Sequence, residues 1–250
     1  MLQLVDIHKS FEGRFTPILN GINLKLEAGD FCVLIGANGS GKSTMLKVIS
    51  QEYKPDSGTV LIDGVHGSKA VSLVTQDINK GTIPEMTLLE NIALSQMRVK
   101  KPQLAFYSRY KDKAVDIITK LGVGLQDRIN QPMQELSGGQ RQVIATLMAI
   151  HSANKILLLD EHTSALDPKT HGMLMEYTVK ATKEANLTTM MITHRMDDAL
   201  KYGNRLIMLH GGKVVFDIAR SEKAKMNLSE LLTLFHKYED LDLTARMGQK

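Results

Sequence analysis

One stretch decides the fold of this chain: Gly36-Ala37-Asn38-Gly39-Ser40-Gly41-Lys42-Ser43-Thr44. It fits the phosphate-loop pattern G-x-x-x-x-G-K-[S/T]. The apolar residues 31–35 before it predict a buried strand, and residues 45–49 after it have the apolar spacing of a helix. Between a strand and a helix, the glycines let backbone N–H groups close around an anion without Cβ clashes. We therefore predict a nucleotide site rather than a simple glycine turn, in which Lys42 contacts the β- and γ-phosphates and Ser43 ligates Mg²⁺.

The composition is that of a soluble globular α/β protein. Hydrophobic residues make up 43% and charged residues 23% of the 250 residues. A single cysteine, Cys32, excludes an internal disulfide framework and fits a reducing compartment. The first residues lack the basic and apolar regions of a signal peptide, and no apolar run is long enough to span a bilayer. A net charge of +4 permits an anionic ligand or a membrane surface, and we expect no nucleic-acid partner.

The remaining pattern predicts a parallel core with two additions. Residues 2–8 and 22–26 have the alternation of antiparallel strands, which indicates a β-rich flap beside the core. Residues 87–152 are mostly helical in pattern, and Thr87 and Glu90 are spaced as a capping box at the first of these helices. Within them the stretch from Arg98 to Lys113 is basic, which is typical either of a solvated helix or of a surface facing lipid head groups.

A second glycine stretch, Ser137-Gly138-Gly139-Gln140, lies about a hundred residues after the phosphate loop. Ser137 and Gln140 have the spacing of a capping box, so we expect a helix to begin there. Two glycines in its first turn destabilise a helix by roughly 1 kcal/mol each. Nothing nearby in the sequence offsets this cost, so we infer that bare backbone N–H groups are needed there. The stretch is therefore predicted to be a second anion site.

Two acids, Asp160 and Glu161, end the buried strand predicted at residues 155–161. At the carboxyl end of a strand beside a phosphate loop, Asp160 is expected to hold Mg²⁺ through water. Glu161 is expected to act as the general base that orients the attacking water. The alternative is that the two acids cap the next helix, but the phosphate loop in the same chain favours the catalytic interpretation. Asp167, followed by Pro168, is predicted to be the N-cap of the helix that comes next.

Three further candidates are weaker when each is taken alone. Gln76 and His194 each follow a predicted strand, and such residues are usually surface or structural. At the edge of the sheet that carries Asp160, Gln76 is predicted to ligate Mg²⁺ and contact the water, and His194 to sense the γ-phosphate. Phe11 is either a core or loop aromatic or a face on which adenine stacks.

Taken together, these motifs resemble the ATPase subunit of an ATP-binding cassette (ABC) transporter over residues 2–220. The phosphate loop, residues 136–142, the strand to Asp160 and Glu161, residues 164–167 and His194 occur in the family's order and approximate spacing. Gln76 fits the family's glutamine loop, and Phe11 the place of its adenine-stacking aromatic. The resemblance implies an α/β, P-loop NTPase fold with a parallel core sheet, an antiparallel β subdomain and a helical subdomain.

The resemblance also implies domains, partners and an activity. Residues 1–220 would form the ATPase domain, with the helical subdomain at about 77–152, and residues 221–250 a helical tail. Two copies would bind ATP and Mg²⁺ head to tail, each ATP lying between one phosphate loop and the partner's second glycine stretch, with Asp167 at the interface. The enzyme would hydrolyse ATP on the inner face of the cell membrane, beside integral-membrane permease subunits and a substrate-binding protein.

One departure from the family narrows the resemblance. The family usually has proline after the two acids, whereas this chain has His162. Residues 160–168 and residues 81–84 resemble a bacterial subgroup that accompanies importers of amino acids and similar solutes. Rival hypotheses are a cassette ATPase of a soluble assembly, such as an iron–sulfur scaffold, and a small-molecule kinase. A small-molecule kinase would use the phosphate loop but would need no stretch like residues 136–142, so this hypothesis is disfavoured. Cassette proteins of translation or DNA repair usually carry two cassettes in one chain or a long coiled-coil insertion, and this sequence shows neither.

Overall fold

The computed structural model describes residues 1–13, 16–63, 70–77, 80–97 and 108–247. The chain forms two compact units, one made of Met1–Ser68 with Thr188–Lys250 and the other of Lys69–Leu187. Most of the basic stretch predicted from Arg98 onward lies outside the described residues. Among the described residues, no helix combines the length and apolarity that a bilayer crossing requires.

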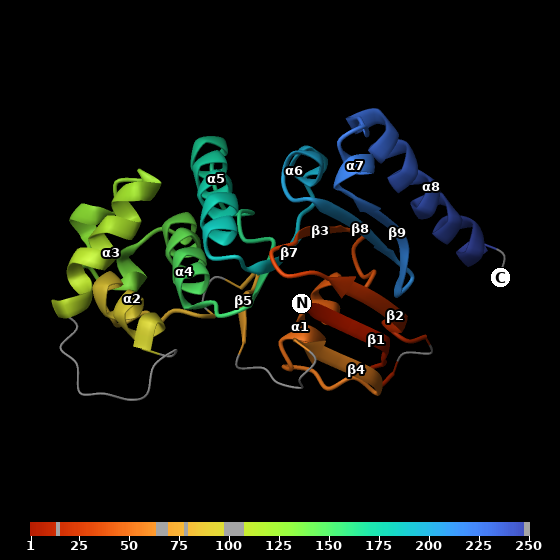
Figure 1. Cartoon of the computed structure of the whole chain (residues 1–250), viewed down its shortest axis with the longest axis horizontal. Helices are drawn as coiled ribbons and strands as arrows, with labels where there is room; N and C mark the ends of the chain where they lie inside the picture. The colour runs from red at the N-terminus through yellow and green to blue at the C-terminus, as the bar shows by residue number, and fades with distance from the viewer. Residues whose placement is uncertain (14–15, 64–69, 78–79, 98–107, 248–250) are drawn as a thin grey trace. The chain divides into compact units, whose positions relative to one another are not determined.

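An antiparallel sheet opens the first unit, as the alternating pattern predicted. β1 (Leu2–Lys9) lies between β2 (Leu19–Leu26) and β4 (Ser57–Ile62) and pairs antiparallel with both (Figure 1). The burial of β2 alternates along most of its length, since one face of the sheet covers the core.

A second sheet in the same unit carries the phosphate loop. β3 (Phe31–Ile35) is buried throughout and pairs in parallel with β7 (Thr188–Ile192) and β8 (Arg205–His210). β9 (Lys213–Ala219) closes a hairpin with β8. α1 (Lys42–Ile49) follows β3, and α6 (Met196–Lys201) follows β7.

The end of the chain is helical. α7 (Arg220–Lys223) leads into α8 (Leu228–Met247). Tyr238 of α8 donates a hydrogen bond to the Val215 carbonyl at 3.3 Å, and its ring lies 5.8 Å from that of His210. These contacts hold α8 against the β8–β9 hairpin (Figure 1).

The second unit contains a parallel strand pair and four of the described α-helices. β5 (Val71–Val74) pairs in parallel with β6 (Ile156–Asp160). The helices are α2 (Leu88–Met97), α3 (Ser108–Leu121), α4 (Gly138–Ser152) and α5 (Pro168–Glu184), with short 3-10 turns at Gln126–Arg128 and Met133–Glu135. The four helices lie next to one another (Figure 1). Their apolar side chains form one core, which includes Leu88, Ile118, Ile144 and Leu174.

The predicted helix starts are confirmed. The Thr87 amide donates to the Glu90 carboxylate at 2.7 Å, and the Glu90 amide donates to the Thr87 hydroxyl at 3.2 Å. Ser137 and Gln140 form the same reciprocal box at α4, and Asp167 caps α5 with Pro168 in its first turn. Local side-chain chemistry therefore specifies these three boundaries.

Candidate nucleotide-binding site

The phosphate loop runs from the end of β3 into α1, and its glycines are required by its geometry. Gly36, Gly39 and Gly41 all have positive φ, at 148°, 80° and 105°. A Cβ atom at Gly36 would lie 2.2 Å from the Leu209 carbonyl oxygen. At Gly41 it would lie 2.7 Å from the carbonyl oxygen of Ile18. Any side chain at these two positions would therefore displace the backbone of the loop.

The start of α1 is open to an anion. Its N-cap is Gly41, which supplies no side-chain cap, and the first turn has no acid. Bare N–H groups and the helix dipole both favour a phosphate at this end. Lys42 is only 6% exposed and donates from Nζ to the carbonyl oxygens of Gly36 at 2.8 Å and Ala37 at 2.9 Å. The lysine therefore already lies over the loop where the phosphates are predicted.

Other polar groups of the loop also fit a phosphate ligand. Ser40 is buried, and among the described residues its hydroxyl oxygen has no hydrogen-bond partner. A buried hydroxyl is stabilised when it finds a partner, which a phosphate oxygen would supply. Ser43 and Thr44 are half-buried in the first turn of α1, whereas Asn38 is exposed. The loop therefore has both the cradle and the polar groups that a nucleotide needs.

His194 and Phe11 belong to the same unit as the phosphate loop. β7 pairs in parallel with β3, with Leu34 opposite Ile192, so His194 follows β7 at the edge where the loop follows β3. Its side chain is exposed. The Phe11 ring is 37% exposed and meets the Tyr53 ring edge to face at 5.3 Å. Lys9 Nζ lies over the ring, 5.5 Å from its centroid, so Phe11 is a partly exposed loop aromatic and its stacking on adenine stays a prediction.

The acids and Gln76 belong to the second unit, where the register of β5 and β6 brings two of them together. Val74 lies opposite Leu159, so Gln76 and Glu161, each two residues further on, are neighbours. Gln76 donates from Nε2 to Glu161 Oε2 at 3.2 Å. Asp160 is buried at the end of β6. An amide and two carboxylates thus gather at one strand end, and oxygen ligands of this kind suit Mg²⁺.

The second glycine stretch lines a hollow of about 440 Å³. The N-termini of α4 and α5 both border it, through Ser137, Gly139 and Gln140 on one side and Asp167 and Thr170 on the other. Two helix N-termini facing one space favour an anion there. The cap of α4 is occupied, since the Gln140 amide donates to the Ser137 hydroxyl at 3.2 Å. The glycines had suggested that all backbone N–H groups at this helix start are bare. The structure shows that at least the Gln140 amide is not.

Gly139 has a packing role that sequence reasoning missed. A Cβ atom there would lie 3.0 Å from the Ala165 carbonyl oxygen and 3.3 Å from the Leu166 side chain. The glycine therefore lets α4 approach the loop that follows Glu161. No local pattern could have shown this, because the two segments are distant in sequence.

Asp167 ends that loop as the cap of α5. Its Oδ1 accepts hydrogen bonds from the backbone amides of Lys169 at 3.0 Å and Thr170 at 3.1 Å. Hydrogen bonds from Thr170, above all, hold the pKa of the Asp167 carboxyl below its usual range. The carboxylate is therefore ionised at neutral pH and belongs to the wall of the hollow.

The comparisons with known proteins agree with this geometry. Residues 19–164, more than half of the chain, match the family model described as "ABC transporter". A tyrosine transport ATP-binding protein of Clostridioides difficile (strain R20291) is 39% identical over 247 residues, which cover 94% of this chain and 98% of the relative. The chain belongs to the ABC transporter family. It is an ATP-binding and ATP-hydrolysing subunit of such a transporter.

Further relatives support the same family and fold. The methionine import ATP-binding protein MetN of Caulobacter vibrioides is 30% identical, covering 99% of this chain and 76% of the relative. A dimeric, post-hydrolysis structure of the ATP-binding cassette MJ0796, bound to ADP and Pi, superposes with a TM-score of 0.78. It is 28% identical and covers 88% of this chain and 99% of that one. The predicted ABC ATPase fold is therefore confirmed, and the soluble-scaffold alternative is not favoured.

His162, which departs from the usual family proline, is buried in the ABC cassette. It is 1% exposed, and burial, with a smaller effect of nearby His171, lowers its pKa to about 3. Among the described residues, its Nε2 has no hydrogen-bond partner. The imidazole is therefore neutral at physiological pH and acts as a core side chain rather than as a proton carrier.

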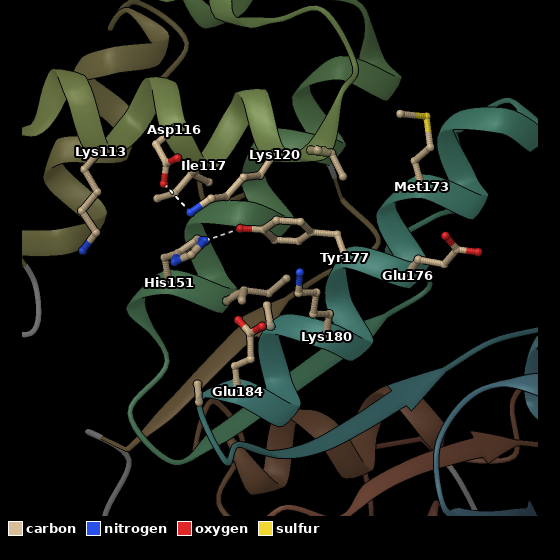
Figure 2. A pocket seen from close by; sticks show the side chains of 14 residues that line it. Lys113, Asp116, Ile117, Lys120, His151, Met173, Glu176, Tyr177, Lys180 and Glu184 are labelled. Carbon is tan, nitrogen blue, oxygen red and sulfur yellow. Dashed lines mark hydrogen bonds and ion pairs between the residues drawn. The ribbon is translucent and has the colours of Figure 1, made fainter.

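The second unit of the cassette also contains a cavity of about 780 Å³ between α3, α4 and α5. Figure 2 shows His151 and Tyr177 pointing toward each other inside it, and their Nε2 and hydroxyl oxygen are 2.6 Å apart. Burial lowers the pKa of His151 and raises that of Tyr177 to about 12, so the pair is neutral at pH 7. Lysines and acids of α3 and α5 surround the pair, and Lys120 is bonded to Asp116 at 2.6 Å. The described lining of this cavity contains none of the residues predicted to bind the nucleotide.

Proposed function

We propose that two copies of this cassette form an ATP-dependent, head-to-tail dimer. Each ATP would lie between the phosphate loop of one copy and the second glycine stretch of the other. The observation that carries this proposal is the hollow at Ser137, Gly139 and Gln140, which opens at the N-termini of two helices. The dimeric state of the related cassette MJ0796, bound to ADP and Pi, supports it.

The lining of the hollow explains why it needs a partner. Its described walls contain no lysine or arginine, and Asp167 adds a negative charge. A helix N-terminus stabilises a nearby anion by only about 0.3–1 kcal/mol at an exposed site. The hollow alone is thus a weak site for a highly charged nucleotide. A phosphate loop with Lys42, brought by a second copy, would supply the missing positive charge.

Each residue then has a role in hydrolysis. Lys42 and the bare N–H groups of α1 would bind the β- and γ-phosphates, with Phe11 stacked on the adenine. Bound Mg²⁺ would neutralise charge on the phosphates, and the oxygen donors that fit it are Ser43, Gln76 and Asp160. Glu161 would take a proton from the attacking water, and His194 would contact the γ-phosphate. General-base help of this kind is worth about 10²–10⁴ in rate.

A complementation experiment tests the shared site. Lys42→Ala removes the phosphate-loop charge, and Ser137→Arg fills the hollow, so each variant alone should be inactive. In a mixed head-to-tail dimer, both lesions fall in one site and the other site is intact. Mixing the two purified variants should therefore restore about a quarter of the parental ATPase rate by random pairing. If the mixture stays as inactive as its components, the nucleotide is not shared between copies.

A second variant tests the general base. Glu161→Gln keeps the shape of the side chain but replaces the carboxylate with an amide that cannot accept a proton. Turnover should therefore stop while ATP binding remains. The ATP-bound dimer should then accumulate and be visible by light scattering after size exclusion, whereas Lys42→Ala should stay monomeric. Parental steady-state hydrolysis by Glu161→Gln would show that this residue is not the base.

We also propose a docking surface for the permease. Ile83, Met86 and Leu94 are exposed apolar side chains at or just before α2. Asn91 is buried and braces the turn before α2: its Oδ1 accepts from the Ile83 amide at 2.8 Å, and its Nδ2 donates to the carbonyls of Ile83, Met86 and Thr87. Two exposed apolar side chains on a braced turn, with a third on the helix that follows, are suited to a short apolar helix of a membrane subunit.

A matched pair of variants tests that surface. Met86→Glu should abolish co-purification with the permease and leave the ATPase rate of the free cassette unchanged. Val5→Glu places the same charge on an exposed apolar residue of β1 and should change neither property. Equal loss of co-purification in both variants would contradict the assignment.

The proposed transporter is an importer of an amino acid or a similar small solute, with a substrate-binding protein as a further partner. The nearly full-length match to a tyrosine transport protein supports this substrate class. Such a subunit would work as a peripheral protein on the inner face of the cell membrane. Membrane fractionation with a co-purifying permease, followed by uptake of labelled tyrosine and methionine into vesicles, would test both points.

A further inference from the structure

Gln142 of α4 reaches two backbone groups on the loop that follows β6. Its Nε2 donates to the Glu161 carbonyl oxygen at 3.3 Å, and its Oε1 accepts from the Ala165 amide at 3.1 Å. The side chain is only 2% exposed. A buried amide with both ends bonded to one loop holds that loop more firmly than a single contact would. Gln142 lies two residues after the second glycine stretch, so it links that stretch to Glu161.

The residue that Gln142 holds has an unusual backbone. Glu161 has φ of 51°, a conformation that residues other than glycine rarely adopt. Its carbonyl oxygen also accepts from the Ser164 amide at 3.0 Å, and its carboxylate accepts from Gln76 at 3.2 Å. Such a conformation persists when the surroundings over-determine it, and it is common at functional sites. Two glutamines therefore restrain the proposed base, one through its side chain and one through its backbone.

A second contact joins α4 to the same loop. Gly139 allows its helix to lie against the Ala165 carbonyl, where a Cβ atom would be only 3.0 Å away. Gln142 holds the amide of the same residue. A movement of the first turn of α4 would thus move Ala165 and, through Gln142, the backbone of Glu161.

We propose that Gln142 is a positioning residue that sets the orientation of Glu161 according to the position of α4. This inference rests on the proposed roles of Glu161 as base and of the second glycine stretch as a contact for the partner's ATP. When that ATP engages the first turn of α4, Gln142 carries the contact to the base of its own chain. Nucleotide binding at one site is in this way coupled to the hydrolytic residue of the other.

The test separates positioning from stability. Gln142→Met keeps the volume and removes both hydrogen bonds, so kcat should fall about 10- to 100-fold while the KM for ATP stays within about twofold. Thr146→Val is the matched control: its hydroxyl donates to the Gln142 carbonyl at 2.8 Å, it is fully buried in the same helix, and it does not bond to the loop. It should keep the parental kcat. Thermal unfolding of each variant checks that it is folded.

Three outcomes would overturn the inference. One is a parental kcat for Gln142→Met, and another is an equal loss of kcat in Thr146→Val, which would indicate general helix stability. Should Gln142→Met not fold, Gln142→Glu keeps the acceptor for Ala165 and removes the donor to Glu161, and a parental kcat there would be the third. Glu161→Gln in the same assay separates the two proposals: if it hydrolyses ATP normally, the assigned base is wrong, whereas if only the Gln142 variants do, Glu161 remains the base.

Discussion

The phosphate loop and the second glycine stretch are both glycine-rich helix starts, but they are built in opposite ways. α1 begins at Gly41, with no side-chain cap and positive φ at the glycine. α4 begins at Ser137 with a complete reciprocal capping box, and its Gly139 serves a close approach to Ala165. In the first case, glycine opens the helix end to a ligand. In the second, glycine lets the helix pack on the loop after Glu161.

The difference explains the division of labour proposed for the two ends. An uncapped helix with a buried lysine over it can bind phosphate by itself. A capped helix that packs on the loop of the proposed general base is suited to sense a nucleotide held by another chain. Substitutions in each region should therefore fail differently: ATP binding should be lost in the first and turnover in the second.

The largest effect is expected from Gly36→Ala. Its Cβ atom would collide with the Leu209 carbonyl at 2.2 Å, so the loop must move. We expect ATP affinity to fall about 100-fold, or roughly 3 kcal/mol, by titration with a fluorescent nucleotide. Gly211→Ala is the control, because its φ of 53° is also positive but nothing lies within 4 Å of the added atom. Equal losses of affinity in both would show that backbone strain, not the collision, disrupts the site.

Gly139→Ala should reduce turnover about tenfold and leave ATP binding at the phosphate loop unchanged. The added atom presses on Ala165 at 3.0 Å and shifts the loop that carries the proposed base, a displacement to which catalysis is sensitive. Gly172→Ala, in α5, meets nothing within 4 Å and should instead stabilise the fold by about 0.5–1 kcal/mol. Urea unfolding and steady-state hydrolysis measure the two effects. A loss of ATP affinity in Gly139→Ala would contradict the separate roles proposed for the two glycine regions.

His162 should make the free energy of unfolding depend on pH. The folded state keeps the imidazole neutral, with a pKa of about 3, whereas the unfolded chain protonates near pH 6.5. This contribution to stability is complete above pH 6.5 and declines as pH falls toward 3, by up to about 1.4 kcal/mol per pH unit. His162→Leu should therefore lose less stability than the parent between pH 7.5 and 5.5. At pH 8, where the imidazole is neutral in both states, the difference in unfolding free energy between parent and variant gives the packing cost of the substitution alone. If the unfolding free energies of parent and variant fall in parallel with pH, His162 is not the cause of the pH dependence.

Ser137→Ala should have a modest effect, mainly on folding. It removes one half of the capping box of α4 and should cost about 1 kcal/mol in the free energy of unfolding. The start of α1 has no such cap to remove. A loss of turnover larger than this stability change explains would support the hydroxyl as a nucleotide contact, and parental turnover would argue against it.

Much of this molecule could be predicted from local patterns. The strand before the phosphate loop, the three capped helix starts and the antiparallel β1–β2 pair all follow from residues close in the chain. Capping boxes and apolar periodicity are local interactions, so a single sequence reveals them. The contact between Gln76 and Glu161 was foreseeable only as a shared sheet edge, because it depends on the register of two strands.

By itself, the sequence determined that the chain has a phosphate loop, two acids at a strand end and a second glycine-rich helix start. Only the tertiary structure decided the role of the second glycine stretch and the contacts that restrain Glu161. It assigned Gly139 to packing on Ala165, His162 to the core, and Gln142 to the backbone of Glu161. The reason is physical: steric clearance, burial and hydrogen bonds between distant segments depend on positions in space, and the order of residues along the chain does not record them.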